Sequence, residues 1–386
     1  MTFRYVLVAP GSFKGTLTAQ MAAGAIAMGV HDAMPGVTTH LVPLADGGEG
    51  IVSVLCDAFD ATVMNSDVAG PMHGQHVDAQ WAYSEETATA IIEMASAAGL
   101  GLVPPERRNP CTTTTLGVGE LIRIACEHGA KRLVIGLGGS ATNDAGTGMA
   151  RALGFRFLEA NGVELEEGGA SLSRLDSIML PQPTPAFRFH EVIGICDVDN
   201  PLLGPDGASR MFAPQKGASE QDVECLERSL SRFALIVSSQ MGQTVDSVPG
   251  AGAAGGMGAG LLVFLQAKLR PGIDVVFDAI HFDEALKSAS LVITGEGRID
   301  AQTAHGKVIH GVVSRARSMG IPVIAMAGSV EGDTVTVAGA LGLTEIATLV
   351  NEKTNMDEAI AKPAVHLRQR TAETIRGLIA HDTMLK

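Results

Sequence analysis

The sequence predicts an α/β protein: a doubly wound, mostly parallel sheet domain with a second, mixed α/β domain inserted in it. Three observations lead to this fold class. Apolar runs typical of buried strands alternate with helical segments at both ends of the 386-residue chain. In the middle, a turn at residues 70–74 precedes alternating residues at 76–83, which is typical of antiparallel strands. Polar, glycine-containing segments adjoin the apolar runs, as at the carboxyl edge of an open sheet.

The opening of the chain predicts a βαβα unit. Residues 4–9 form an apolar run expected to be a buried strand, and residues 38–42 predict a second strand. Thr18 can cap a helix that extends to about residue 32, and residues 51–59 predict a shorter helix. This order favours a parallel sheet with right-handed crossovers.

The remaining elements differ between the middle of the chain and its last third. Residues 131–152 predict another strand–glycine–helix unit, and residues 260–269 predict a helix. The last third returns to strict alternation, with helices between strands expected at 291–294, 322–327 and 345–349.

Strands and helices alternate in the same way at the two ends of the chain, and this predicts the domain boundaries. Residues 1–66 and 281–386 are expected to form the doubly wound domain, and residues 67–280 the inserted mixed α/β domain. Because the chain crosses twice between the domains, we expect a hinge and an active-site cleft between them.

The composition excludes several classes of protein. Hydrophobic residues make up 46% and charged residues 18% of the chain, which is typical of a globular protein. A net charge of −14 and only 4% aromatic residues argue against a nucleic-acid partner. The five scattered cysteines predict reduced thiols in a cytoplasmic protein. Residues 247–267 are uncharged, but their glycine-rich first half favours a loop before a buried helix over a membrane span.

Glycine and carboxylate residues recur beside the apolar runs and suggest one ligand site. Such segments let parallel strands gather carboxylates, hydroxyls and a few cations in one cleft. This set of groups suits Mg²⁺-assisted phosphoryl transfer. The five segments are residues 9–15, 45–50, 138–144, 196–201 and 295–300.

The first two segments supply a cation and two acids. Lys14 is either a solvated turn lysine or an ammonium beside phosphate or carboxylate oxygens, with Ser12 donating a hydrogen bond. Asp46 lies next to glycines that allow close approach to a ligand, and could serve as base or metal ligand. Glu49 could instead cap the helix that follows.

The third segment supports two different functions. Residues 136–141 fit the GxGxx(G/A) pattern, which by itself suggests a nicotinamide-dependent dehydrogenase of a small hydroxy acid. Thr142, Asn143 and Asp144 follow, and a dinucleotide-binding helix does not need such polar residues in its packed first turn. They fit the lining of a phosphate or substrate pocket better.

The later segments add oxygen ligands. Asp197 and Asp199 are expected on one side of the chain, and with Asn200 they resemble a hard-cation or general-base site. Charged and polar residues within 296–307 follow a predicted strand, so some should face the cleft. The glycine-rich segment 249–256 is either a close-packing element or a backbone cradle for phosphates.

Together these segments resemble the bacterial glycerate kinase family, type one, the glycerate 2-kinases. The similarity extends in order along nearly the full length of the chain. It is carried by Ser-Phe-Lys-Gly at 12–15, Ala-Asp-Gly-Gly-Glu-Gly at 45–50, Gly-Gly-Ser-Ala-Thr-Asn-Asp at 138–144, Asp197 with Asn-Pro-Leu at 200–202, residues 212–217, the glycine-rich 249–256 and Thr-Gly-Glu-Gly at 294–297.

The resemblance implies ATP-dependent phosphorylation of D-glycerate to 2-phosphoglycerate, with Mg²⁺. From the composition and the uncharged segment described above, we expect no nucleic acid or membrane as partner. For such a reaction we expect Lys14, Asp46 and Asp197 to be catalytic, and Asp46 and Asp197 to be the metal ligands. The residues expected to bind substrate or phosphate are Ser12, Ser140, Thr142, Asn143, Asp144, Asn200, Glu296 and Asp300.

One departure from the family pattern bears on the chemistry. Gly11 stands where the family usually has Asp before Ser-Phe-Lys. A chain that lacks this carboxylate could be a catalytically degenerate binding protein with a kinase fold. This alternative and the dehydrogenase remain open from the sequence, as does assembly into a homo-oligomer.

Overall fold

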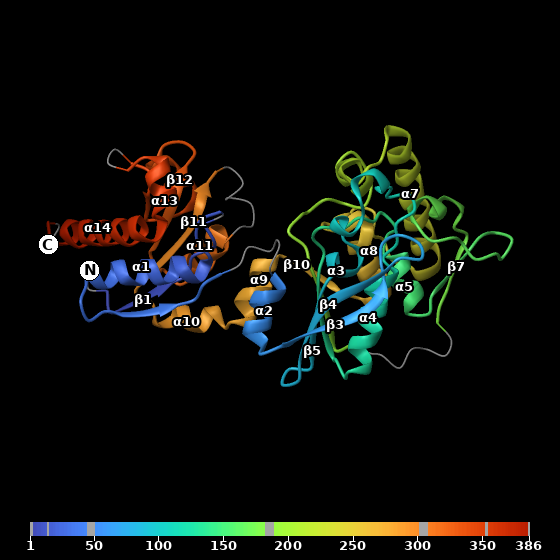
Figure 1. Cartoon of the computed structure of the whole chain (residues 1–386), viewed down its shortest axis with the longest axis horizontal. Coiled ribbons are helices and arrows are strands. Elements are labelled where there is room, and N and C mark those ends of the chain that lie inside the picture. The colour runs from blue at the N-terminus through green and yellow to red at the C-terminus, as the bar shows by residue number, and fades with distance from the viewer. Residues whose placement is uncertain are drawn as a thin grey trace. The chain divides into compact units, whose positions relative to one another are not determined.

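The computed structural model describes residues 3–13, 15–44, 51–181, 189–300, 308–351 and 354–384. The chain divides into two compact units. The first unit comprises Met1–Gly50 and Ile273–Lys386, and the second comprises Ile51–Gly272. Figure 1 labels several elements of each unit, among them β1, β11 and α14 in the first and β3, α4 and α8 in the second.

In the described part of the first unit, five parallel strands form a sheet in the order β13-β12-β11-β1-β2. Thr18 caps α1 as predicted, because its side chain accepts a hydrogen bond from Met21 N. The strands are β1 (Tyr5–Val8), β2 (Thr38–Leu41), β11 (Leu291–Ile299), β12 (Val323–Val330) and β13 (Glu345–Thr348). The helices are α1 (Ala19–Ala33), α9 (Gly272–Ala279), α10 (Phe282–Ser288), α11 (Val308–Ser318), α12 (Thr334–Leu341), α13 (Met356–Ala361) and α14 (Pro363–Met384).

The second unit is built on a mixed sheet of six described strands in the order β10-β9-β6-β5-β4-β3. Its β3, β4 and β5 pair antiparallel, as the alternation at 76–83 predicts, and the other pairs are parallel. The strands are β3 (Thr62–Ala69), β4 (His76–Ser84), β5 (Thr89–Glu93), β6 (Arg132–Gly136), β9 (Glu191–Ile195) and β10 (Lys268–Arg270), with β7 (Arg156–Leu158) and β8 (Ser177–Met179) forming a separate pair. The helices are α2 (Ile51–Phe59), α3 (Ala95–Ala98), α4 (Leu116–Glu127), α5 (Thr147–Ala152), α6 (Ala208–Phe212), α7 (Glu220–Met241) and α8 (Ala253–Leu265).

The unit boundaries fall at Gly50 and Gly272, earlier than the expected boundaries at 66/67 and 280/281. The first difference arises because α2 packs on β4 and β5, and because β3 pairs with β4. The second arises because α9 belongs with α11. Arg315 of α11 binds Asp274 of α9 with Nη2 and Oδ1 3.1 Å apart.

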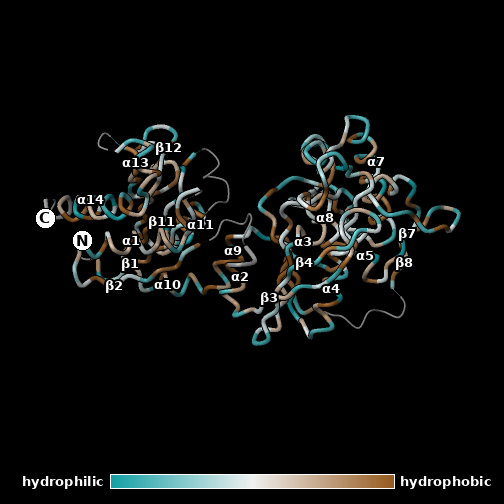
Figure 2. The backbone as a smooth tube through the Cα atoms, in the orientation of Figure 1, coloured by the Kyte–Doolittle hydropathy of each residue, from teal (hydrophilic) through white to brown (hydrophobic). Residues whose placement is uncertain are grey.

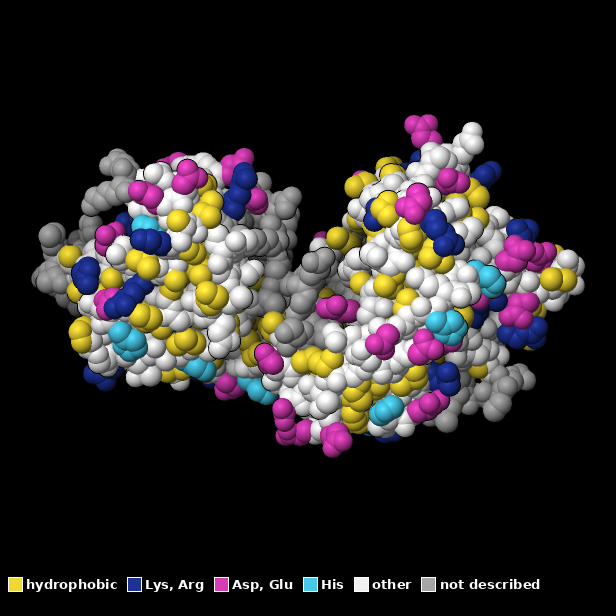
Figure 3. Space-filling model, in the orientation of Figure 1, with side chains coloured by type: hydrophobic (Ala, Val, Ile, Leu, Met, Phe, Trp, Pro, Cys, Tyr) yellow, Lys and Arg dark blue, Asp and Glu magenta, His cyan; other side chains and the backbone are white. Residues whose placement is uncertain are grey.

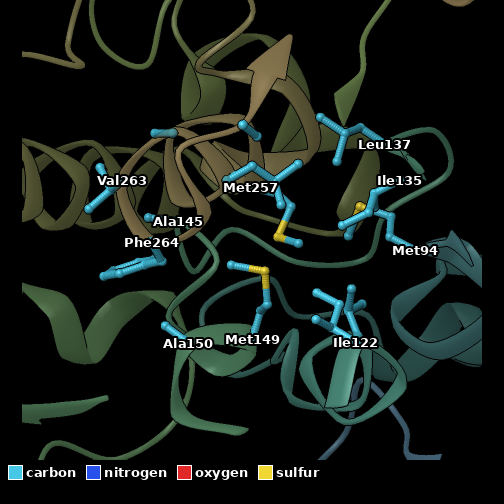
Figure 4. Packing of buried hydrophobic residues seen from close by; sticks show 14 of the residues in the cluster. Met94, Ile122, Ile135, Leu137, Ala145, Met149, Ala150, Met257, Val263 and Phe264 are labelled. Carbon is cyan, nitrogen blue, oxygen red and sulfur yellow. The ribbon is translucent and has the colours of Figure 1, made fainter. Parts of the chain in front are cut away.

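Each unit has its own apolar interior, which Figure 2 shows as brown segments inside and teal segments on the outer loops. In the first unit α1 and α14 lie side by side, and a Cβ on Gly29 would stand 2.3 Å from the Arg368 carbonyl oxygen. The second core lies between the sheet and helices α4, α5 and α8. In Figure 4, Met149 of α5 and Met257 of α8 point toward one another there. This packing gives the segment between β6 and α5 a rigid support.

Among the described helices, none combines the length and the apolar character that crossing a bilayer requires. The uncharged stretch at 247–267 instead contains α8, whose residues are mostly buried. On the visible face in Figure 3, acidic and basic side chains are interspersed over both units.

Candidate functional site

The polar loop at residues 138–144 connects β6 to α5 at the carboxyl edge of the second sheet. The neighbouring strand β9 runs parallel to β6, with Gly136 paired with Ile195. The segment that carries Asp197 therefore leaves the same edge of the sheet. The predicted ligand residues in the polar loop are all buried: Ser140, Thr142, Asn143 and Asp144.

A buried lysine from another part of the second unit holds this loop. Lys216 is 2% exposed and lies at the end of a short 3₁₀ helix. Its Nζ donates hydrogen bonds of 2.8 Å to Ser140 Oγ and 2.8 Å to the Thr142 carbonyl oxygen. Gly217 then takes a φ of 94°, and a Cβ there would stand 2.5 Å from a backbone oxygen. The turn after Lys216 therefore requires glycine.

Burial lowers the pKa of Lys216 to about 7, while the charge of Asp144 acts in the opposite direction. A neutral amine has two N–H groups, one for each of the two acceptors of Lys216, which are Ser140 Oγ and the Thr142 carbonyl oxygen. The ammonium form has three N–H groups. The hydrogen-bonding geometry therefore suits the neutral form.

Sequence reasoning missed Lys216 as a functional residue. It entered only as part of segment 212–217, on which the family resemblance partly rests. A lysine beside glycine is normally solvated, and nothing in the local sequence marks this one as buried. The resemblance of the segment was the one signal that could have drawn attention to it.

Asp144 anchors the other end of the polar loop. Its Oδ2 accepts hydrogen bonds from Thr115 N, Thr115 Oγ1 and Gly148 N, and its Oδ1 accepts one from Gly146 N. Burial raises the pKa of this carboxyl, while these hydrogen bonds lower it. Both oxygens already bind protein donors, so Asp144 fixes the loop against the start of α4.

Two buried atoms in the loop have no hydrogen-bond partner among the described residues: Thr142 Oγ1 and Asn143 Oδ1. The amide nitrogen of Asn143 donates to Ser209 Oγ at 3.2 Å, which leaves the amide oxygen as the acceptor without a partner. A buried polar atom without a partner costs about 1–3 kcal/mol. A bound ligand or water at this position would remove that cost.

The glycine-rich segment 249–256 packs directly behind the polar loop. A Cβ on Gly255 would stand 2.0 Å from the Thr142 carbonyl oxygen, and one on Gly252 would stand 2.2 Å from the Pro201 carbonyl oxygen. Ala145 N also donates to Gly255 O at 3.1 Å. These contacts support the close-packing alternative for this segment.

The segment after β9 presents its acids to solvent. Asp197 and Asp199 are exposed, and Asp197 Oδ1 accepts a hydrogen bond of 2.8 Å from Gly272 N. Asn200 Nδ2 donates to the Asp206 carbonyl oxygen at 2.8 Å, which ties this residue to its own loop. Asp197 thus has a fixed orientation at the sheet edge and remains accessible.

A pocket of about 430 Å³ lies in the first unit at the carboxyl ends of its parallel strands. It brings together three predicted residues from two distant parts of the sequence: Ser12 after β1, Glu296 in β11 and Asp300 after β11. Arg298 binds Glu331 with Nη2 and Oε2 2.9 Å apart, and its Nε lies 4.0 Å from Asp300 Oδ2.

The candidate residues therefore belong to two separate units. Ser12, Glu296 and Asp300 lie in the first unit, whereas Asp197, Asn200 and the residues of the polar loop lie in the second. Lys14, Asp46 and Glu49 lie outside the described residues, so their roles remain predictions.

Gly11 does not have a left-handed backbone. It is absent from the described residues with positive φ. A Cβ there would stand 3.4 Å from Val308 Cγ2 and 3.6 Å from the Gly295 carbonyl oxygen. The first atom of a side chain therefore fits at position 11.

The described residues contain no cluster of three or more His, Cys, Asp or Glu that could hold a metal ion. Mg²⁺ does not need such a cluster, because it is usually held by one or two carboxylates together with substrate phosphates and water. The exposed carboxylate of Asp197 fits this requirement.

Comparisons with known proteins agree with one another. Residues 6–379 match the model of the glycerate kinase family. The chain is 44% identical over 374 residues to a glycerate kinase of Bacillus subtilis (strain 168), with 97% of each chain covered. It is 45% identical over 354 residues to a glycerate 2-kinase of Escherichia coli (strain K12), covering 92% of each.

A solved structure is similar over nearly the whole chain. It is a crystal structure from Salmonella typhimurium LT2, proposed to be glycerate kinase 2. The TM-score is 0.84 at 39% sequence identity, with 99% of this chain and 100% of the other covered. This similarity confirms the predicted α/β fold class.

Proposed function

We propose that this chain, which belongs to the glycerate kinase family, transfers the terminal phosphoryl group of ATP to D-glycerate and forms 2-phosphoglycerate. The observation that carries the proposal is the buried polar loop at 138–144, held at a sheet edge beside Asp197. Phosphoryl transfer depends mainly on positioning and on neutralising charge, and rigid polar groups at such an edge suit both needs. We further propose that it acts in the cytoplasm, where its five free cysteines would stay reduced.

Roles for the second unit follow from the exposure of its acids and from the buried polar atoms that lack a hydrogen-bond partner. Asp197 is exposed and oriented, so it is our candidate for the base that accepts the proton of the glycerate hydroxyl, or for a metal ligand. Asn143 Oδ1 is buried without a partner, so it could accept a hydrogen bond from a substrate hydroxyl. Lys216 and Asp144 act through the loop that they hold, and are positioning residues.

Bound Mg²⁺ would neutralise the negative charge that develops on the transferring phosphoryl group. Asp197 is the described carboxylate that would hold it, and Asp46 is the second ligand predicted from the sequence. For Lys14, Ser12 and Asn200 we keep the roles expected from the sequence, which are contacts to phosphate or glycerate oxygens.

The dehydrogenase alternative is weaker on structural grounds. In a dinucleotide-binding unit the glycine pattern opens directly into a helix whose N-terminus binds the pyrophosphate. Here β6 ends at Gly136 and α5 begins only at Thr147, with the buried polar loop between them. The pattern at 136–141 therefore lacks the helix that this function needs.

A coupled assay of ADP release with D-glycerate and MgATP tests the proposal, and NMR of the product identifies the phosphorylated hydroxyl. We expect release that depends on glycerate and that EDTA abolishes. ATP hydrolysis that is indifferent to glycerate, or turnover that survives removal of the metal, would contradict the assignment.

The degenerate-kinase alternative is tested by changing position 11. Gly11→Asp restores the carboxylate that the family usually carries, and Gly11→Ala controls for the added Cβ. An inactive wild type with an active Gly11→Asp variant would favour the degenerate binding protein. Turnover by the wild type would exclude it.

A further inference from the structure

The pocket of the first unit lies where the sheet changes direction. In the order β13-β12-β11-β1-β2, the chain continues from β1 to β2 on one side and from β11 to β12 on the other. Ser12 follows β1, Glu296 and Gly297 lie in β11, and Leu349 follows β13. Open α/β sheets bind ligands at this switch point, outside the carboxyl ends of their strands.

One wall of the pocket is apolar and exposed. It is formed by the residue after β13, by α13 and by the start of α14. Met356 is 48% exposed and Ile360 is 53% exposed, although both are large hydrophobic residues. The apolar wall residues are Leu349, Met356, Ala359, Ile360 and Pro363. A flat, weakly polar ring would remove this surface from water, and apolar walls with a few polar groups are typical of small-molecule sites.

The opposite side of the pocket carries carboxylates. Among the described lining residues, these are Glu296 and Asp300. Arg298 lies between Glu331 and Asp300, with Nη2 2.9 Å from Glu331 Oε2 and Nε 4.0 Å from Asp300 Oδ2. Carboxylates in α/β nucleotide sites accept hydrogen bonds from sugar hydroxyls, so Glu296 and Asp300 suit a ribose.

We infer that this pocket binds the nucleoside part of ATP. The base packs against the wall formed by Met356 and Ile360, and the ribose hydroxyls point toward Glu296 and Asp300. The volume of about 430 Å³ lies within the range of small-molecule sites. The inference deepens the proposed function and rests on it for the identity of the nucleotide.

Direct binding to the full chain tests the inference without relying on turnover. Equilibrium dialysis or calorimetry measures the Kd of ADP and of adenosine, which carries no phosphate. Ile360→Glu places a third carboxylate in the pocket and removes part of the apolar wall. We expect it to weaken both ligands at least tenfold, because both contain the nucleoside.

Val335→Glu is the matched control. Val335 is 78% exposed on α12 of the same unit and does not line the pocket. Val335→Glu adds the same charge as Ile360→Glu but outside the pocket, so we expect both Kd values to stay within twofold of the wild type. Met356→Glu is a second pocket variant, at the first residue of α13 where an acidic residue is compatible with the helix. Thermal melts establish that each variant folds.

The outcomes separate the inference from the proposed function. Kd values for ADP and adenosine that are unchanged in both pocket variants would overturn the inference, as would a wild type that binds neither ligand. A pocket variant that weakens glycerate binding and leaves ADP binding intact would also overturn it. A third outcome is that the wild type binds ADP and adenosine, that Ile360→Glu weakens both, and that the wild type phosphorylates no glycerate. This outcome would support the inference and contradict the kinase function.

Discussion

The protonation of Lys216 makes the stability of this protein depend on pH. The pKa falls from 10.5 in the unfolded chain to about 7 in the fold, because burial disfavours the ammonium. Between these two values the unfolded state binds more protons than the folded state. Stability must therefore rise with pH across this window, and the penalty of the buried charge is fully present below about pH 7.

Comparison with Lys216→Met isolates this effect, since methionine keeps most of the length without a charge. From pH 7 to pH 9 the wild type should gain about 2 kcal/mol of unfolding free energy relative to the variant. Urea unfolding at the two pH values measures the difference. Lys287→Met, at an exposed lysine of α10, should follow the wild type. Identical pH profiles for wild type and Lys216→Met would mean that the buried group does not titrate in this range.

Asp197 is the residue on which the proposed chemistry depends most. Asp197→Asn keeps an oxygen that can accept the hydrogen bond from Gly272 N, but it removes the charge that a base or a Mg²⁺ ligand needs. We expect kcat to fall by roughly a hundredfold or more, as is typical for the loss of a general base, while the fold survives. Steady-state kinetics measures the loss.

Asp206→Asn controls for the loss of one charge at another exposed acid of the second unit. It should change kcat much less. A folded Asp197→Asn enzyme with nearly normal kcat would transfer the role of base to another acid, with Asp46 as the next candidate.

The glycine-rich segment before and within α8 determines how closely two elements of the second unit can pack. Gly255 has a φ of 68°, and its missing Cβ allows contact with the backbone of Thr142. Gly242 has the same φ of 68° at the end of α7, but a Cβ there would meet nothing within 4 Å. The two glycines therefore share a backbone conformation and differ in packing.

Gly255→Ala and Gly242→Ala use this difference. Both variants carry the cost of a side chain at positive φ, about 1 kcal/mol. Gly255→Ala must also displace the loop that holds Asn143, which we expect to add about 1–3 kcal/mol of destabilisation and to lower kcat. Chemical unfolding and kinetics of both variants provide the measurement. Equal destabilisation would show that the loop has room to move.

The elements that the sequence predicted well are those with local signals. Thr18 identified the start of α1, and the alternation at 76–83 identified antiparallel β4. The domain boundaries at 66/67 and 280/281 differ from the unit boundaries because periodicity predicts a helix but not the sheet that it covers. Thus α2 was expected in the first unit but packs in the second. Conversely, α9 was expected in the second unit but packs in the first.

In the candidate site, too, the residues with local sequence signals could be predicted, and those that depend on tertiary packing could not. Gly138–Asp144 was recognisable because glycine and polar residues concentrate in one short segment. Lys216 was not, because its partners Ser140 and Thr142 lie more than seventy residues away in the chain. Its burial depends on tertiary packing that no local pattern encodes. The apolar wall of the pocket likewise combines residues from the ends of separate strands and helices.

At the scale of the whole molecule, the candidate residues lie on two units that the chain connects twice. The cleft and hinge between domains remain predictions from the sequence. If both units contact one pair of substrates, the protein should become more compact when both are bound. We expect the radius of gyration from small-angle X-ray scattering to decrease when ADP and D-glycerate are added together. No change at saturating concentrations of both would contradict closure, and each ligand alone serves as the control.

The pairing of Val6 in β1 with Leu291 in β11 affects how this chain is made. A ribosome completes β1 and β2 long before it reaches β11, and at 5–20 residues per second the delay is on the order of tens of seconds. The inserted unit is synthesised during this delay, while one edge of β1 still lacks its partner. An unpaired edge can associate with other chains. The open edge of β1 is therefore the part of the nascent chain that we expect to be most prone to aggregation until β11 is synthesised.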